Sequence, residues 1–436
     1  MANLSRIGIA IDSDLLERFD RSIGKSGYTN RSEAFRDLIR DRLVAERTAA
    51  PDAVVVGTVT LIYDHHAHGV TEKLTELQHA HHDLVVSTYG RGFYIMPDLT
   101  PLEQGIKPET ITSAVQFIAP KPTYRISQAG RADWTFVLKE APKNPVMLEV
   151  LEGDDKGAVI RKLPDLTARA GWNRATWDLH YEAPRTVALR TTPPEDPHIW
   201  EEPRFKGQDT RPITHWGISQ GQGAPLAAPG KYTLRMTVDG QAYTEPIEVL
   251  RAPDAHGSDA DLRASLKLQV KVRDDINTVS DLTNQIEWMR RQLEDQGKTV
   301  TDQSGKAALL KAMDAIDQKM QDVEYKMITR AEALSDDKYY VTQYKLYLNF
   351  LWLSGEIGGG AGDVAGNGDY GPTETATAMV LDLEKQLQAV EAEYKGLMDR
   401  DVAAYNKSIE GSGLAPLKTT GAPPPPPPRG GRGGEY

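Results

Sequence analysis

The start of the chain combines one alternating stretch with two stretches at helical spacing. Ile7, Ile9 and Ile11 alternate with small or polar residues, which predicts a strand with one apolar face. Apolar residues then recur on one face of each of two helices, namely Leu15, Leu16, Phe19 and Ile23, followed by Ala34, Phe35, Leu38, Ile39 and Leu43. So small a unit cannot bury its apolar side alone, and we therefore expect it to form a dimer.

Capping and stop signals delimit these two helices. Asp12 or Ser13 is a suitable N-cap for the first helix, because a short side-chain oxygen can accept hydrogen bonds from the first turn. Gly24 favours the end of that helix. Asn30 and Glu33 have the spacing of a capping box, which places the start of the second helix in the loop 29–32.

A histidine-rich segment lies between two predicted strands. Residues 54–63 are β-branched and largely apolar, which is typical of a buried strand, and residues 84–89 predict a second strand. Six of the ten histidines lie between residues 65 and 82. Since imidazole suits nickel, copper and zinc, this segment is either a metal site or a histidine cluster with weak, adventitious metal affinity.

The middle of the chain carries short strand signals separated by turns. Residues 134–138 and 146–152 alternate, and GWNRATWDLHY places Trp172, Trp177 and Tyr181 in or beside another strand. Asp239-Gly240 is a hairpin turn signal between two further strands, 232–238 and 243–249. This spacing predicts an immunoglobulin-like or fibronectin-like sandwich, with the Pro-rich loop 184–229 as an insertion. The tryptophans suit either sugar stacking or core packing.

The last part of the chain is predicted to be helical. Apolar stripes predict helices over residues 258–296, 305–334, 338–354 and 373–408, which together form a bundle or antiparallel coiled coil. The Gly-rich stretch 355–372 lacks the Gly-Lys-Ser/Thr ending of a phosphate-binding loop and is interpreted as a flexible connection. The tail GAPPPPPPRGGRGGEY has a low-complexity composition that predicts disorder.

Composition narrows the class of protein. The chain has 436 residues, enough for two to four domains, and its 39% hydrophobic content can form cores. No run of eighteen apolar residues and no signal peptide are found, so we expect a cytoplasmic protein without a membrane partner. The absence of cysteine excludes disulfides and thiolate ligands. The net charge of -11 argues against the whole chain coating nucleic acid.

The segments RIGIAIDSDLLERFD, GYTNRSEAFRDLIRDRL and TELQHAHHDLVVST carry a family resemblance. Together they resemble the ribbon-helix-helix family, and more narrowly the nickel-responsive regulators. The resemblance implies that the strands of two chains form a ribbon in the major groove of double-stranded DNA. Arg6, Gly8 and Ala10 would then face the bases, where Arg6 suits guanine and the Ala10 methyl group suits thymine. The alternative is an ordinary strand and helical hairpin that binds no DNA.

The same resemblance implies contacts from the loop that opens the second helix. Its residues Thr29, Asn30, Arg31 and Ser32 would bind phosphate and position the ribbon on the duplex.

For the histidine segment, the resemblance implies the first half of a ferredoxin-like domain that binds nickel. His79 matches the first nickel ligand. Gly90 and Gly92 stand where the family has two further histidine ligands, and the fourth ligand would be a cysteine, which this chain lacks. One of the four expected ligands therefore remains. We expect nickel as a cofactor, but with a weakened binding site.

From about His82 onward the chain resembles a second family. HHDLVVSTYGRGFYIMPDLTPLEQ is similar to the end of bacterial sortilin-like or BNR-repeat glycosidase-like propeller proteins. The propeller itself is missing, and no paired carboxylates or Ser/His/Asp arrangement indicates an enzyme. The alternative function is therefore an accessory C-terminal fragment of such an exported protein, joined to the regulator-like start.

The predicted fold class is multidomain α+β. The predicted parts are a ribbon-helix-helix domain (1–48), a truncated ferredoxin-like half (53–89), a linker (90–122), a β-sandwich (123–252), a helical bundle (256–410) and a disordered tail (411–436). The function we expect is that of a homodimeric DNA-binding transcriptional regulator, a repressor without enzymatic activity.

Overall fold

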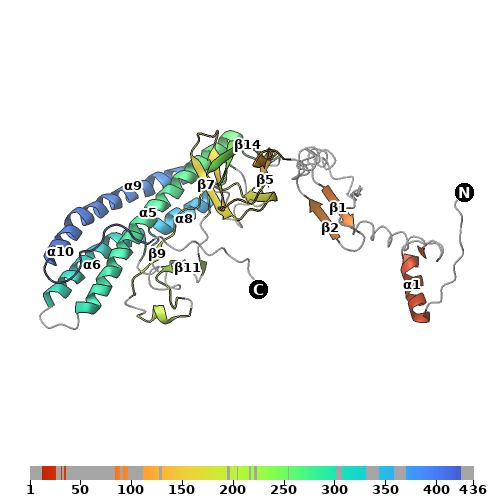
Figure 1. Ribbon diagram of the computed structural model, residues 1–436. Helices are drawn as coiled ribbons and strands as arrows, with labels where there is room; N and C mark the ends of the chain where they lie inside the picture. The colour runs from red at the N-terminus through yellow and green to blue at the C-terminus, as the bar shows by residue number, and fades with distance from the viewer. Residues whose placement is uncertain are drawn as a thin grey trace. The chain divides into compact units, whose positions relative to one another are not determined.

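The computed structural model describes residues 12–25, 31, 34–35, 84–88, 92–96, 111–126, 130–193, 197–203, 205–215, 218–219, 223–253, 255–300, 307–329, 343–357 and 370–423. The chain divides into two compact units, Met1–Gly105 and Ile106–Tyr436 (Figure 1). In the described part of the chain, no helix is both long enough and apolar enough to cross a membrane.

The first unit contains helix α1 (Ser13–Lys25) and a hairpin of strands β1 (Leu84–Thr88) and β2 (Gly92–Met96). Asp12 caps α1, since its Oδ1 accepts a hydrogen bond from the Asp14 backbone N–H at 3.0 Å, as the sequence predicted. Strand β1 confirms the second predicted strand, and it pairs antiparallel with β2. The predicted ribbon strand and the strand over 54–63 lie outside the described residues.

Two sheets make up the first half of the second unit. One has five strands in the order β4-β14-β13-β6-β7, and the other has three strands in the order β3-β5-β8. All neighbouring pairs are antiparallel except β14 with β4, which run parallel. The strands of these sheets are β3 (Val115–Phe117), β4 (Thr123–Arg125), β5 (Ala132–Leu138), β6 (Val146–Glu152), β7 (Val159–Leu166), β8 (Gly171–Trp177), β13 (Gly230–Val238) and β14 (Gln241–Arg251).

The turn between β13 and β14 follows directly from two residues. Asp239 and Gly240 have positive φ angles of 46° and 88°, the conformation that a two-residue hairpin turn needs. The Asp239 carboxylate also accepts hydrogen bonds from the Lys143 and Asn144 backbone N–H groups, which fixes the turn against the start of β6. The predicted hairpin is therefore confirmed.

Both sheets contribute side chains to one hydrophobic core. Trp134 and Phe136 of β5 and Leu234 of β13 are completely buried there. Trp177 is completely buried in the same core, so this tryptophan serves packing rather than sugar stacking. Two sheets around one core form a sandwich-like arrangement, whereas the likeness to immunoglobulin or fibronectin domains remains a prediction.

The second half of this unit is helical. The long helix α5 (Asp259–Val300) packs against α6 (Ala307–Met327), α8 (Leu346–Ile357) and α9 (Glu374–Gly396) (Figure 1). Helix α9 continues through a π-helical turn, η4 (Leu397–Val402), into α10 (Ala403–Ser408). Each of the four predicted helical segments contains a helix, but α8 begins at Leu346 and not at residue 338, and it extends to Ile357, into the predicted flexible connection. Residues 358–369 of that connection lie outside the described residues.

The Pro-rich region 184–229 is inserted between β8 and β13, and it packs on both halves of the unit, since Leu226 lies in the core of the sheets. It contains β9 (Ala188–Leu189), η2 (Ile199–Glu201), β10 (Arg211–Pro212), β11 (Thr214–His215) and β12 (Ile218–Ser219). Leu189 and Ile213 belong to the core of the helices. The backbone of this region is held by polar side chains of α5, because the Ala188 N–H donates to Asn284 at 2.7 Å and the Thr192 N–H donates to Glu294 at 2.7 Å.

Two segments predicted to lack structure are partly ordered. Strands β2 and β3 lie inside the predicted linker 90–122, because each finds a strand partner outside that segment. The predicted disordered tail is described as far as Pro423. Its Leu417 is buried among the helices and exchanges two backbone hydrogen bonds with the Asn406 side chain, and the Pro423 carbonyl accepts from Arg190. The remaining domain boundaries stay predictions.

Candidate functional site

In the segment that was predicted to be a ribbon-helix-helix domain, the described residues show two helical stretches in contact. The Phe19 ring of α1 lies 4.7 Å from the Phe35 ring, measured between centroids, and Ala34 is 2% exposed. Leu15, one of the predicted apolar stripe residues, is 56% exposed. A single copy of the chain therefore buries only part of the apolar stripe.

An ion pair joins the same two helical stretches. The Arg31 Nε donates to Asp20 Oδ1 at 2.7 Å, and a second guanidinium nitrogen donates to Asp20 Oδ2. The hydrogen bond from Arg31 lowers the pKa of the Asp20 carboxyl below its usual value, and the hydrogen bond to Asp20 raises the pKa of Arg31. The side chains are 55% and 37% exposed for Arg31 and Asp20, so this bidentate pair faces water.

Arg31 is the one predicted site residue that falls within the described residues. The other predicted contacts lie outside them, namely Arg6, Gly8, Ala10, Thr29, Asn30 and Ser32 for DNA and His79 for metal. Within the described ranges, no group of three or more His, Cys, Asp or Glu side chains is arranged to hold a metal ion. The sequence did not predict a partner for Arg31, because Asp20 lies eleven positions earlier and on another helix.

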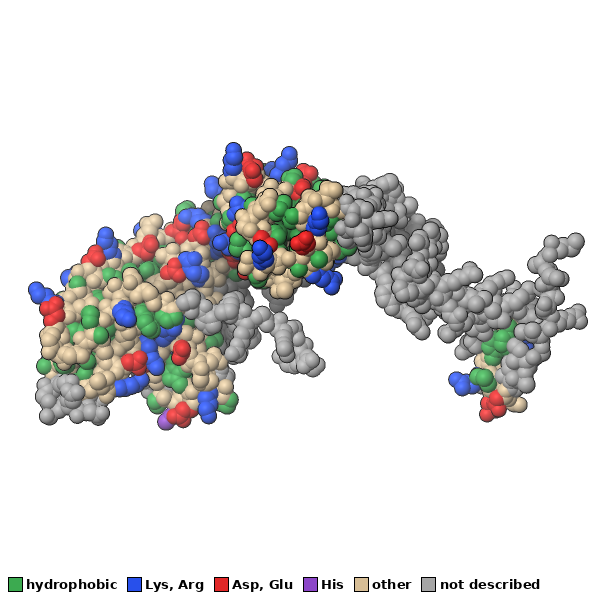
Figure 2. All heavy atoms as spheres, in the orientation of Figure 1, with side chains coloured by type: hydrophobic (Ala, Val, Ile, Leu, Met, Phe, Trp, Pro, Cys, Tyr) green, Lys and Arg blue, Asp and Glu red, His purple; other side chains and the backbone are tan. Residues whose placement is uncertain are grey.

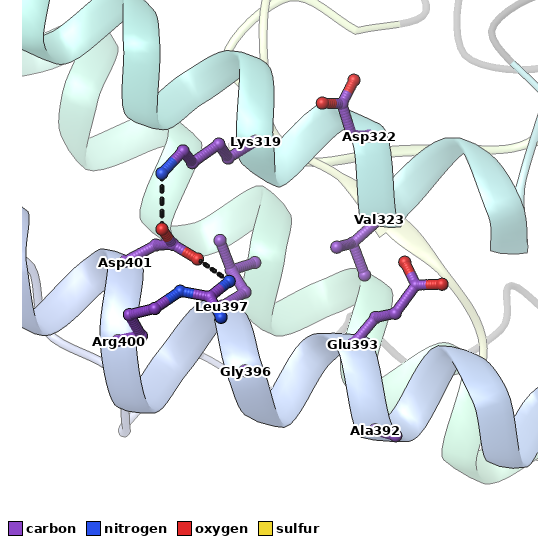
Figure 3. A pocket seen from close by; sticks show the side chains of 9 residues that line it. All are labelled: Lys319, Asp322, Val323, Ala392, Glu393, Gly396, Leu397, Arg400 and Asp401. Carbon is purple, nitrogen blue, oxygen red and sulfur yellow. Dashed lines mark hydrogen bonds and ion pairs between the residues drawn. The ribbon is translucent and has the colours of Figure 1, made fainter.

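A hollow of about 460 Å³ lies in the second unit between α6 and the α9–η4 helix (Figure 3). Figure 3 shows Lys319 and Arg400 pointing at Asp401, and both donate hydrogen bonds to its carboxylate. The hydrogen bond from Arg400, followed by that from Lys319, lowers the pKa of Asp401. Because Lys319 and Arg400 favour the charged form of Asp401, this carboxyl is not an activated acid.

A buried charge cluster links α5 and α6. Arg290 donates to Glu287 at 3.0 Å, to Glu324 at 2.7 Å and to Asp317 at 2.8 Å. Glu287 also accepts hydrogen bonds from the backbone N–H groups of Arg190 and Thr191. Glu287 and Arg290 lie one turn apart on α5, and their other partners come from α6 and from the Pro-rich region. The cluster therefore joins that region to the bundle.

The ionisation of this cluster follows from its burial. Burial raises the pKa of Glu287, but Arg290 and the Arg190 and Thr191 donors outweigh burial and hold this pKa below its usual value. Burial raises the pKa of Glu324 well above its usual value, and the Arg290 charge offsets this only in part. Burial therefore favours the neutral form of Glu324, whereas Glu287 is held in its charged form beside the Arg290 guanidinium. The sequence signal that could have revealed it is Glu287 on the apolar stripe of α5, eight positions after Val279.

Comparisons with known proteins place the resemblance in the first part of the chain. Residues 5–46 match the family model of ribbon-helix-helix proteins of the copG family. Residues 56–90 match the model of the NikR C-terminal nickel-binding domain. The start of the chain is therefore similar to ribbon-helix-helix proteins and then to the nickel-binding domain of the NikR regulators.

Individual relatives agree with these two models. The chain is 62% identical over 88 residues to a protein of Solibacter usitatus named as a nickel-responsive regulator. It is 54% identical over 87 residues to one of Trichlorobacter lovleyi and 48% identical over 88 residues to one of Dictyoglomus turgidum, both with the same name. Each match covers 20% of this chain and 63% to 65% of the relative, so the chain spans less than two thirds of these regulators. These matches all lie near the start of the chain, and the resemblance of the later residues to propeller proteins stays a prediction.

Proposed function

We propose that this chain is a DNA-binding transcriptional regulator that acts through a homodimer of its ribbon-helix-helix segment. The observation that carries the proposal is the match of residues 5–46 to ribbon-helix-helix proteins. The capped helix α1 and its Phe19 contact with Phe35 support it, because they give the two-helix packing that such a unit requires. Such a role requires the chain to reside in the cytoplasm.

The exposure of Leu15 supports the homodimer. This side chain lies on the apolar stripe of α1 yet is 56% exposed in one copy. Removing its apolar surface from water is favourable, and a second copy of the same segment is the partner that the two-stranded ribbon itself requires. We therefore assign Leu15 to the contact between the two copies.

DNA contacts are assigned to two sets of residues. Arg6, Gly8 and Ala10 lie on the small face of the ribbon strand and read the bases in the major groove. Residues 29–32, namely Thr29, Asn30, Arg31 and Ser32, hold phosphates and position the ribbon. The exposed guanidinium of Arg31 supports this second role.

The surface of the second unit favours the first unit as the DNA-binding part. Figure 2 shows Lys and Arg side chains interspersed with Asp and Glu over the visible face of the sheets and helices. Nucleic-acid binding needs a clustered positive surface, since most of its affinity comes from phosphate contacts. The mixed charge of this face, together with the net charge of -11, offers no such cluster among the side chains drawn there.

The change Arg6→Ala is expected to weaken specific DNA binding by about 1–3 kcal/mol, because it removes a bidentate contact to guanine. The measurement is a gel-shift titration of the full chain on an operator selected from a random-sequence library. Arg18→Ala is the matched control, since it removes the same charge from the exposed side of α1 without a base contact. An unchanged sequence preference for Arg6→Ala would refute the base-reading role.

Nickel is the cofactor that the match of residues 56–90 supports, but the donor set does not fit a complete site. His79 is the one matching ligand, Gly90 and Gly92 carry no donor, and the chain has no cysteine. We therefore derive no nickel-dependent step for this chain.

The full chain is expected to bind nickel far more weakly than a four-ligand square-planar site would. Three of the four expected donors are missing, so any remaining affinity comes from the histidine cluster. An absorbance titration with nickel, repeated on His79→Ala, measures this. A tight, stoichiometric square-planar signal that His79→Ala abolishes would prove the expectation wrong.

A further inference from the structure

Asp20 binds the same guanidinium group of Arg31 that a contact with DNA phosphate would need. A guanidinium presents its N–H donors as a planar fork, which fits a carboxylate and a phosphate in the same bidentate manner. In this structure the Nε and one terminal nitrogen of Arg31 both donate to the two oxygens of Asp20. That edge of the guanidinium is thus filled by an anion of the chain itself.

We propose that Asp20 is an internal competitor for DNA phosphate at Arg31 and sets how tightly the chain holds DNA. This inference rests on the proposed function, in which Arg31 contacts phosphate. The inference gives a role to Asp20, a residue of α1 to which no DNA contact was assigned. Asp20 acts only through its hydrogen bonds with Arg31.

Two physical effects give Asp20 this role. A phosphate that binds the same edge of Arg31 must displace the carboxylate, and the displaced carboxylate stays close enough to repel it. Both side chains are exposed, at 55% and 37%, so the pair is screened by water and salt and can open readily. Asp20 therefore weakens DNA binding without blocking it.

The competition has a characteristic signature. Phosphate contacts form with every DNA sequence, whereas base contacts form only on the right one. Asp20 thus lowers the affinity for specific and random duplexes by the same factor, and the ratio of the two affinities does not depend on it. A purely structural pair, which only holds the two helices together, predicts instead that losing Asp20 weakens both the fold and DNA binding.

The test compares full-length wild type, Asp20→Asn, Arg31→Gln and the double variant by fluorescence anisotropy with a random-sequence duplex over a series of salt concentrations. Asp20→Asn is expected to bind about two- to fivefold more tightly per protomer. Arg31→Gln is expected to bind more weakly, with a salt slope about one unit shallower per protomer. In the double variant the gain from Asp20→Asn is expected to disappear.

Asp14→Asn is the matched control. It makes the same charge change on the same exposed helix, six residues or about 9 Å along the axis from Asp20. A gain from Asp20→Asn no larger than that from Asp14→Asn, or a gain that persists beside Arg31→Gln, would overturn the competition. So would weaker binding by Asp20→Asn.

The outcomes also separate this inference from the proposed function. If the wild type binds neither the random duplex nor the selected operator, the proposed function fails and the inference fails with it. If the wild type binds and Arg31→Gln weakens binding while Asp20→Asn changes nothing, the inference alone fails. Circular dichroism of each variant checks the helices, and Asp20→Ser, which also removes the carboxylate, must reproduce the result of Asp20→Asn.

Discussion

The change Arg290→Met is expected to lower the free energy of unfolding of the helical part by about 3–5 kcal/mol, the usual result of breaking a buried ion pair from one side. The Arg290 side chain is only 11% exposed and donates to Glu287, Asp317 and Glu324. Methionine keeps much of the volume but leaves Glu287 in the protein interior without its cation. Urea unfolding of the full chain, followed by far-ultraviolet circular dichroism, measures the loss.

The control for this change is Glu324→Gln, for which we expect a loss below about 1 kcal/mol at neutral pH. Burial raises the pKa of Glu324 well above its usual value, which favours its neutral form, and the neutral glutamine side chain keeps an oxygen acceptor for Arg290. Equal losses of stability for Arg290→Met and Glu324→Gln would contradict the expectation that the Arg290 charge contributes more to stability than the Glu324 carboxyl does.

The difference in the free energy of unfolding between the wild type and Glu324→Gln is expected to depend on pH. Because the folded-state pKa of Glu324 lies above the ordinary value of 4.5, the folded state holds a proton that the unfolded chain releases. The wild type therefore loses stability as the pH rises from 4.5 towards the folded-state pKa, and Glu324→Gln does not. The stability of Glu324→Gln relative to the wild type is therefore expected to increase over that pH range. A difference that does not change with pH would contradict the raised pKa of Glu324.

The change Trp177→Ala is expected to lower the free energy of unfolding of the sheet part by about 3–5 kcal/mol. The indole is completely buried between the sheets and meets the Tyr232 ring edge-on at 5.3 Å between centroids. Its Nε1 also donates to the His180 carbonyl at 2.8 Å, and alanine would leave that carbonyl without this donor. Both the cavity and the lost hydrogen bond act in the same direction.

Thermal unfolding of the full chain measures this loss, with Trp172→Ala as the control. Trp172 lies on the same strand, β8, but is only partly buried, so its loss is expected to be clearly smaller. Similar losses for the two variants would mean that strand β8 as a whole, and not the Trp177 contact, determines stability.

Elements with local signals could be predicted from the sequence. Asp12 caps α1 through its own neighbours, and Asp239-Gly240 forms the hairpin because these residue types tolerate positive φ angles. The long helix α5 follows from an apolar stripe that repeats over many turns. In each case, residues within a few positions of one another supply the determining interactions.

Contacts between distant residues could not be predicted in this way. The Pro-rich region was predicted only as a loop inserted in the sandwich, yet α5 supplies the hydrogen-bond partners for its backbone at Ala188 and Thr192. The pairing of Asp20 with Arg31 is equally invisible in the sequence, since either charge would suit a solvated helix face. The sequence therefore predicted a role for Arg31 but not the carboxylate that accepts its hydrogen bonds.

The sequence by itself predicted one strand and two helices at the start of the chain and, after them, further strands and long helices, because periodicity, caps and turns are local properties. It also predicted an incomplete nickel site, because Gly90 and Gly92 carry no donor atoms and the chain has no cysteine. Only the tertiary structure decided which anion meets Arg31 and which carboxylates share Arg290. Those choices depend on burial and on the distance between side chains from different elements, and neither is encoded at any single position.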